Sequence, residues 1–179
     1  MKVLIINGAP QSGKDTFIDF INEEPNHGAN VYAYSSIDCI KEAAKKIGWD
    51  ERKDTRGRKF LSDLKDALTA YNDTPFWEVV RHGMLANENN YEFFCVCARE
   101  PAEIQKLVEY YEKACIDCHA VLIKNDKAEE DAMKNQTNHA DRNYMNFVYH
   151  FIINNNSTLD VFQRNVRDFL YLLNQRKAA

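Results

Sequence analysis

Short apolar segments alternate along the chain with longer segments in which apolar residues recur every three or four positions. The short segments are rich in β-branched and aromatic residues and predict strands, whereas the three- and four-residue spacing predicts helices. The predicted strands are 2–7, 30–34, 92–98, 120–123 and 147–153. The predicted helices are 15–22, 37–47, 56–71, 76–85, 102–111 and 159–173. Strands that alternate with helices predict a three-layer α/β fold, in which helices cover both faces of a five-stranded parallel sheet.

One segment departs from this alternation. Residues 124–146 contain no Leu, Ile, Val or Phe, so we expect no ordinary core-facing element there. A loop of this length inside a compact domain usually has a function of its own. We therefore predict a lid-like loop over 124–146.

Length and charge limit the possible functions. The 179 residues predict a single domain over 1–179. A net charge of −4 argues against binding of a nucleic acid polymer, although residues 52–59 carry five positive charges and one negative. No apolar run approaches the roughly 20 residues of a membrane span, and we predict a cytoplasmic protein that does not bind membranes. The oligomeric state is left open.

The first predicted strand leads into a phosphate-binding pattern, G-x-x-x-x-G-K, at residues 8–14. Glycines allow backbone N–H groups to converge on phosphate oxygens, the following helix contributes its positive amino end, and Lys14 supplies a point charge. The alternative is a strand-to-helix turn that binds nothing. The predicted ATP-binding residues are Gly8, Ala9, Gln11, Ser12, Gly13, Lys14, Asp15 and Thr16.

The position after the lysine holds Asp15, where a hydroxyl residue usually ligates Mg²⁺. A carboxylate that pointed toward the phosphates would repel them, so we predict that Asp15 faces the metal or its water shell. The hydroxyl of Thr16 is then available to an α-phosphate.

The motif Gly-x-x-x-Ser-Gly-Lys-Asp-Thr resembles the phage-type deoxynucleoside monophosphate kinases and the related animal-type phosphomevalonate kinases, which belong to the nucleoside monophosphate kinase superfamily. The chain departs from the family pattern in two places. Cys97 stands where the family has an aspartate, and the segment His139-Ala140-Asp141-Arg142 follows a His-x-Ser-Glu pattern only loosely. The other matches, in chain order, are Ser36 with Ile40-Lys41, Arg56-Gly57-Arg58-Lys59-Phe60-Leu61 with Asp63-Leu64, Phe76-Trp77 with Arg81, Arg99-x-Pro101-x-Glu103, and Phe151-Ile152-Ile153-Asn154-Asn155-Asn156.

The resemblance implies a nucleoside monophosphate kinase-like fold, and ATP with Mg²⁺ as phosphoryl donor to a (deoxy)nucleoside monophosphate. Residues 37–90 would bind the acceptor, and 124–146 would form the lid, with Arg142 on the nucleotide. Phosphoryl transfer needs cations that hold both phosphates, and an acceptor phosphate is largely deprotonated at pH 7, so no general base is required. Lys14 and Arg99 are the predicted catalytic residues. The predicted acceptor-binding residues are Ser36, Lys41, Arg56, Arg58, Arg81 and Arg99.

Several alternatives stay open. The acceptor could be a non-nucleotide phosphomonoester such as phosphomevalonate, or the chain could bind nucleotide without transferring phosphate. The aromatic residues Tyr71, Phe76 and Trp77 fit either stacking on a base or burial in the core. The cysteines are predicted to be reduced thiols, with a zinc site from Cys95, Cys97 and Cys118 as the less favoured alternative.

Overall fold

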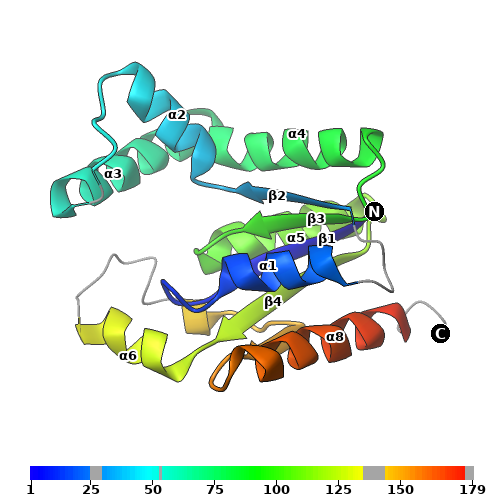
Figure 1. The fold of residues 1–179 in the computed structure, drawn as a ribbon. Coiled ribbons are helices and arrows are strands. Elements are labelled where there is room, and N and C mark those ends of the chain that lie inside the picture. The colour runs from blue at the N-terminus through cyan, green and yellow to red at the C-terminus, as the bar shows by residue number, and fades with distance from the viewer. Residues whose placement is uncertain (25–29, 53, 135–143, 176–179) are drawn as a thin grey trace.

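The computed structural model describes residues 1–24, 30–52, 54–134 and 144–175. Five strands form one parallel sheet (Figure 1), in the order β2-β3-β1-β4-β5. The strands are β1 (Lys2–Asn7), β2 (Val31–Ser35), β3 (Phe93–Cys97), β4 (Cys118–Lys124) and β5 (Phe151–Asn154). The predicted five-stranded parallel sheet is confirmed.

The helices of the described residues follow the strands in the predicted alternation. They are α1 (Lys14–Glu23), α2 (Asp38–Lys46), α3 (Thr55–Asn72), α4 (Thr74–Glu88), α5 (Pro101–Lys113), α6 (Asp126–Lys134) and α8 (Leu159–Gln175), with a short 3₁₀ turn at Tyr144–Asn146. Among the described residues, no helix combines the length and apolarity needed to cross a membrane.

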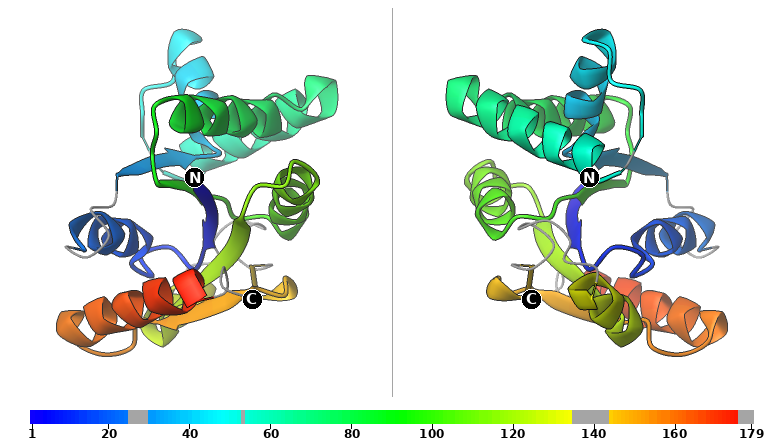
Figure 2. Two further views of the ribbon diagram at one scale, coloured as in Figure 1. Left: turned by 90° about the vertical axis from the view of Figure 1, so that its right-hand side faces the viewer. Right: turned by 90° about the vertical axis from the view of Figure 1, so that its left-hand side faces the viewer.

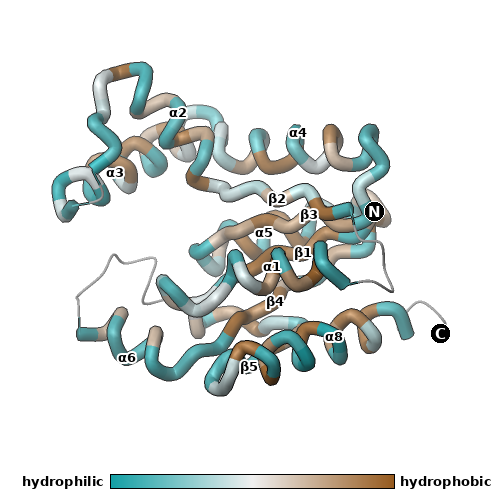
Figure 3. Tube along the Cα trace, in the orientation of Figure 1, coloured by the Kyte–Doolittle hydropathy of each residue, from teal (hydrophilic) through white to brown (hydrophobic). Residues whose placement is uncertain are grey.

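The sheet separates two apolar clusters, and strand residues alternate between them because successive side chains point to opposite faces. Val3 and Ile5 of β1 pack with residues of α4 and α5, whereas Leu4 and Ile6 pack with α1 and α8. Figure 2 shows α1 and α5 on opposite sides of the strands. The chain is therefore a three-layer sandwich, and its central strand β1 contributes apolar side chains to both faces of the sheet. Figure 3 shows the apolar character of the central strands.

The segment 124–146 differs from its prediction as a loop. Residues Asp126–Lys134 form the helix α6, which is polar along most of its length (Figure 3). The helix docks with small side chains, since Ala128 is buried against Ala9 and Leu122. Large apolar residues are not required for this contact, which is why the sequence pattern gave no sign of the helix.

The last strand is shorter than predicted. β5 spans Phe151–Asn154, whereas residues 147–150 precede it without regular structure. They still contribute to the core, because Phe147 and Tyr149 pack against the cluster that contains Val3 and Ile5.

Candidate functional site

The loop between β1 and α1 has an unusual backbone. Gly8, Gln11 and Gly13 have φ angles of 149°, 65° and 98°, which are rare for residues with a side chain. Turns of this kind direct successive N–H groups into one concave surface, which binds anions. Gln11 pays a steric cost of about 1–2 kcal/mol for its left-handed conformation, and such strained positions cluster at functional sites.

The two glycines of the loop also stand where a side chain has no room. A Cβ on Gly8 would lie 2.5 Å from the carbonyl oxygen of Ile123, and one on Gly13 would meet the side-chain nitrogen of Asn155. The same Asn155 nitrogen donates a hydrogen bond of 2.8 Å to the carbonyl of Ser12. The loop is therefore packed between β4 and the turn after β5.

Lys14, the first residue of α1, folds back over the loop. Its Nζ donates to the carbonyl oxygens of Gly8 and Ala9, both at 2.8 Å. The ammonium is thus held at the amino end of α1, where the helix dipole also favours an anion. Inside the same loop, the fully buried Ser12 hydroxyl has no hydrogen-bond partner among the described residues.

Cys97 ends β3, at the position where the sequence resemblance implies an aspartate. Burial raises the pKa of its thiol to about 11; Lys14 and Arg99 counteract this increase, while Asp15 and Asp38 reinforce it. The thiol is therefore neutral at pH 7 and is a poor ligand for Mg²⁺, which prefers oxygen.

Three predicted site residues are among the charged groups that affect the pKa of this thiol, namely Lys14, Asp15 and Arg99. Asp15 is exposed in the first turn of α1. Mg²⁺ is commonly held by one or two carboxylates together with substrate phosphates and water. One carboxylate beside a phosphate loop fits a metal–nucleotide complex.

Arg99 lies two residues beyond β3, with an exposed side chain. Its backbone carbonyl accepts a hydrogen bond of 3.0 Å from the side chain of Asn7, the last residue of β1. Asn7 was not predicted as a site residue, because the partners of its side-chain nitrogen, Arg99 and Tyr149, are far away in the sequence.

Two predicted acceptor residues flank the beginning of α2. Ser36 is buried, and its N–H donates to the carbonyl of Cys97 at 3.1 Å. Lys41 forms an ion pair of 2.7 Å with Asp38 of its own helix. Acceptor binding by Lys41 would therefore require this carboxylate to be exchanged for a phosphate.

Arg56 and Arg58 are exposed in the first turn of α3. Gly57 between them is buried, and a Cβ there would collide with the carbonyl of Arg52. The Asp54 side chain caps the helix by accepting from the Gly57 N–H at 2.8 Å. The glycine is therefore explained by a close backbone contact at the start of α3.

Arg81 lies on the exposed face of α4, where its side chain forms an ion pair of 2.6 Å with Glu78. His82 beside it stacks on Tyr34 with ring centroids 3.8 Å apart.

The three aromatic residues have different environments. Phe76 is buried in the core, and Trp77 packs edge-on against Tyr110. Tyr71 is 84% exposed on α3. Of the three, only Phe76 is buried in the core, as one of the two interpretations predicts.

An ion triad that was not predicted, largely buried at Lys65 and Glu103, connects α3 with the start of α5. Lys65 Nζ lies 2.9 Å from Glu103 Oε2 and 3.1 Å from Glu100 Oε1. The side chains of Lys65 and Glu103 are only 13% and 11% exposed. The triad connects the helix α3 to the segment that follows Arg99.

A shallow polar cavity of about 380 Å³ adjoins the phosphate loop. It is lined by the turns after β4 and β5, at residues Asn125, Asp126, Lys127, Asn155, Asn156 and Ser157. Asn155 links this cavity to the loop through its hydrogen bond to Ser12. The predicted lid arginine, Arg142, lies outside the described residues.

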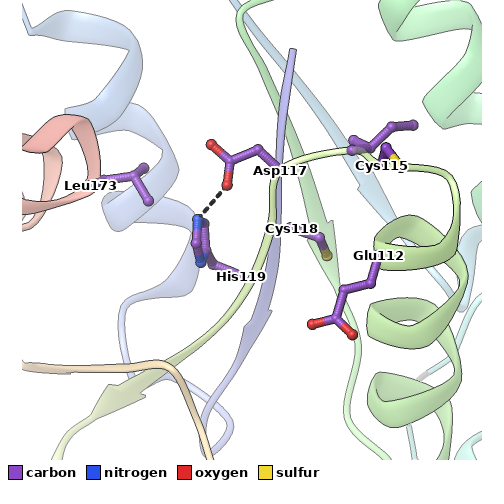
Figure 4. A pocket seen from close by; sticks show the side chains of 7 residues that line it. Glu112, Cys115, Asp117, Cys118, His119 and Leu173 are labelled. Atoms are coloured by element: carbon purple, nitrogen blue, oxygen red, sulfur yellow. Dashed lines mark ion pairs between the residues drawn. The ribbon is translucent and has the colours of Figure 1, made fainter. Parts of the chain in front are cut away.

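A second cavity, of about 500 Å³, lies at the opposite end of the sheet, near the start of β4 (Figure 4). His119 Nε2 lies 2.7 Å from Asp117 Oδ1 there, and the Cys118 side chain points to the other side of the strand. Cys95 and Cys97 belong to β3, which β1 separates from the β4 residue Cys118. Among the described residues, no group of three His, Cys, Asp or Glu side chains is placed to hold a metal ion.

Comparisons with solved structures agree with the fold. A dephospho-CoA kinase from Campylobacter jejuni has a TM-score of 0.52 at 13% identity, covering 96% of this chain and 97% of that one. The crystal structure of APE1195 has a TM-score of 0.56 at 11% identity, covering 97% and 95%. The chain has the fold of P-loop kinases.

These identities are low enough that the likeness concerns the fold alone. A Mycobacterium tuberculosis APS kinase in complex with AMPPNP and APS is also similar, with a TM-score of 0.49 at 14% identity and coverage of 95% and 97%. A scan against protein-family models finds no match, and a search of curated proteins finds none.

Proposed function

We propose that the protein is an ATP-dependent phosphotransferase that moves the γ-phosphoryl group of ATP to a (deoxy)nucleoside monophosphate. The observation that carries this proposal is the loop from Gly8 to Lys14, with its left-handed residues and a lysine held over it. A turn that binds nothing would not need a strained Gln11 or a lysine placed above its carbonyls.

In this reaction an oxygen of the acceptor phosphate attacks the γ-phosphorus, the bond to the β–γ bridging oxygen breaks, and ADP leaves. Phosphate oxygens replace the loop carbonyls as partners of Lys14, and the N–H groups of the loop bind the phosphates. The other proposed contacts to the ATP phosphates are Gly8, Ala9, Gln11, Ser12, Gly13 and Thr16. Asp15 would hold Mg²⁺, which supplies neutralisation of the developing charge when bound.

Arg99 is the proposed cation for the transferring phosphoryl group, because the side chain of Asn7 joins its backbone to Gly8, the first residue of the phosphate loop. The proposed acceptor contacts are Ser36 and, within 37–90, Lys41, Arg56, Arg58 and Arg81. Lys41 and Arg81 would first exchange Asp38 and Glu78 for the acceptor.

The segment 124–146 is proposed to exclude water during transfer, since α6 borders the polar cavity next to the loop. Exclusion of water prevents hydrolysis from competing with transfer. Arg142 keeps its proposed role at the nucleotide.

The test is transfer from ³²P-labelled ATP to a panel of acceptors: the common nucleoside and deoxynucleoside monophosphates, phosphomevalonate, and a control without acceptor. Labelled diphosphate with at least one nucleotide acceptor supports the proposal. Label on phosphomevalonate alone contradicts the nucleotide acceptor.

The second candidate is a nucleotide-binding module without transfer activity. The neutral Cys97 in place of a strand-end carboxylate favours it. Saturable ATP binding with no ADP released in the presence of any acceptor would establish this alternative.

A further inference from the structure

Asn7 is a polar residue buried completely in the centre of the sheet. Its side-chain oxygen accepts from the N–H of Gly8 at 2.7 Å. Its side-chain nitrogen donates to the carbonyl of Arg99 at 3.0 Å and to the hydroxyl of Tyr149 at 2.8 Å. Both amide protons and the carbonyl oxygen therefore have partners, as a buried amide requires.

The neighbours determine which residue type fits. An N–H group such as that of Gly8 can only donate, and a backbone carbonyl such as that of Arg99 can only accept. The position therefore needs one acceptor and one donor on a short side chain, which describes asparagine. A carboxylate in place of the Asn7 amide would put a second acceptor opposite the Arg99 carbonyl, where a donor is needed.

The bonds of Asn7 extend the pairing of β1 and β3 beyond the ends of the two strands. The last register pair is Ile6 with Cys97, and the Ala98 N–H then donates to the Ile6 carbonyl at 3.1 Å. The Asn7 side chain makes the next connection, to Arg99, which is 92 positions away in sequence. One side chain thus binds the first residue of the phosphate loop and the backbone of the proposed catalytic arginine.

We propose that Asn7 is a positioning residue for phosphoryl transfer, which sets the placement of Arg99 relative to the phosphate loop. The inference rests on the proposed function, because it assigns Arg99 to the transferring phosphoryl group. In-line transfer is sensitive to such placement, since a displacement of about 1 Å can cost about 10²-fold in rate.

The test is a double-variant cycle in the full chain, with Asn7→Asp and Arg99→Ala. Asn7→Asp keeps the acceptor for Gly8 and loses the donor to Arg99. We expect kcat to fall by about 10²-fold, with KM for ATP and for the acceptor changed by less than about 3-fold. In the Arg99→Ala background the same substitution should have little further effect, because a residue that acts through Arg99 loses its role with it.

Tyr149→Phe is the matched control, since it removes a partner from the same amide and leaves the bond to Arg99 in place. It should lower kcat by less than about 3-fold. Asn7→Ser, whose hydroxyl is too short to reach the Arg99 carbonyl, replaces Asn7→Asp if that variant does not fold, as judged by its melting curve.

Equal losses in the wild-type and Arg99→Ala backgrounds would overturn the inference, as would an equal loss in Tyr149→Phe. A wild-type chain that transfers no phosphate to any acceptor would overturn the proposed function, and the role of Asn7 with it. The two failures are distinguishable because the wild-type assay precedes the variants.

Discussion

The side chain of Asn155 donates a 2.8 Å hydrogen bond to the carbonyl of Ser12, across 143 positions of sequence. The turn after β5 therefore supports the phosphate loop through this hydrogen bond and also lines the adjacent polar cavity. The contact leaves no space for a side chain on Gly13, which faces the same Asn155 nitrogen. The proposed donor site thus depends on residues from both ends of the chain.

Gly13→Ala should lower both stability and ATP affinity. The residue has a φ of 98°, and its new methyl group would displace Asn155 from the loop. Gly48→Ala is the matched control, with a φ of 97° and no atom within 4 Å of the added Cβ. The backbone cost alone is about 1–2 kcal/mol. Urea unfolding should show a larger loss for Gly13→Ala, and calorimetry should show weaker ATP binding in that variant only.

Asp15→Asn should raise the Mg²⁺ concentration needed for half-maximal transfer, by about 10-fold, because the carboxylate proposed for the metal becomes a neutral amide. Asp19→Asn serves as the control, since Asp19 is also exposed and lies one turn later on α1. Magnesium titrations of the transfer rate distinguish the two. Superimposable curves for Asp15→Asn and the wild type would remove Asp15 from the metal site.

Lys65→Met should reduce the free energy of unfolding by about 3 kcal/mol, because it leaves the buried Glu103 carboxylate without its cation. Lys59→Met removes another lysine of the same helix. The side chain of Lys59 is 74% exposed and forms an ion pair with Asp63. That variant should change stability by less than about 0.5 kcal/mol. Chemical denaturation of both variants tests the comparison, and equal losses would contradict it.

The pKa of His82 is lowered by burial and then by the Arg81 charge. The unfolded chain therefore binds the proton more readily than the folded chain. The contribution of His82 to the free energy of unfolding is therefore fully present above the ordinary histidine pKa of about 6.5, and it is lost as the pH falls below that value. Between pH 7 and pH 5, wild-type stability should fall more steeply than that of His82→Gln. Parallel curves would show that His82 does not contribute.

The fold was predictable because its signals are local. The strand at Lys2–Asn7 was predicted at its observed bounds, since a continuous apolar run ends at an Asn-Gly pair. The helix at Asp126–Lys134 was not predicted, because it docks through Ala128 rather than through large apolar residues. A pattern of large side chains carries no information about such a contact.

The candidate site was predictable only in part, for the same reason. The phosphate loop is a continuous motif, whereas Asn7 and Lys65 act through partners 92 and 38 positions away. The ion pairs of Lys41 and Arg81 were equally hidden, since a charged residue in a sequence does not reveal its partner. The roles of the predicted site residues in ATP and acceptor binding stay predictions.

The most direct test of the central claim is phosphoryl transfer by Lys14→Ala, measured beside the wild type with ATP and the best nucleotide acceptor. The lysine is only partly buried and its bonds are to the loop carbonyls, so the variant should keep a melting temperature within a few degrees of the wild type. We predict that transfer is abolished in this folded variant. Undiminished turnover would contradict the assignment of the loop as the phosphoryl-donor site.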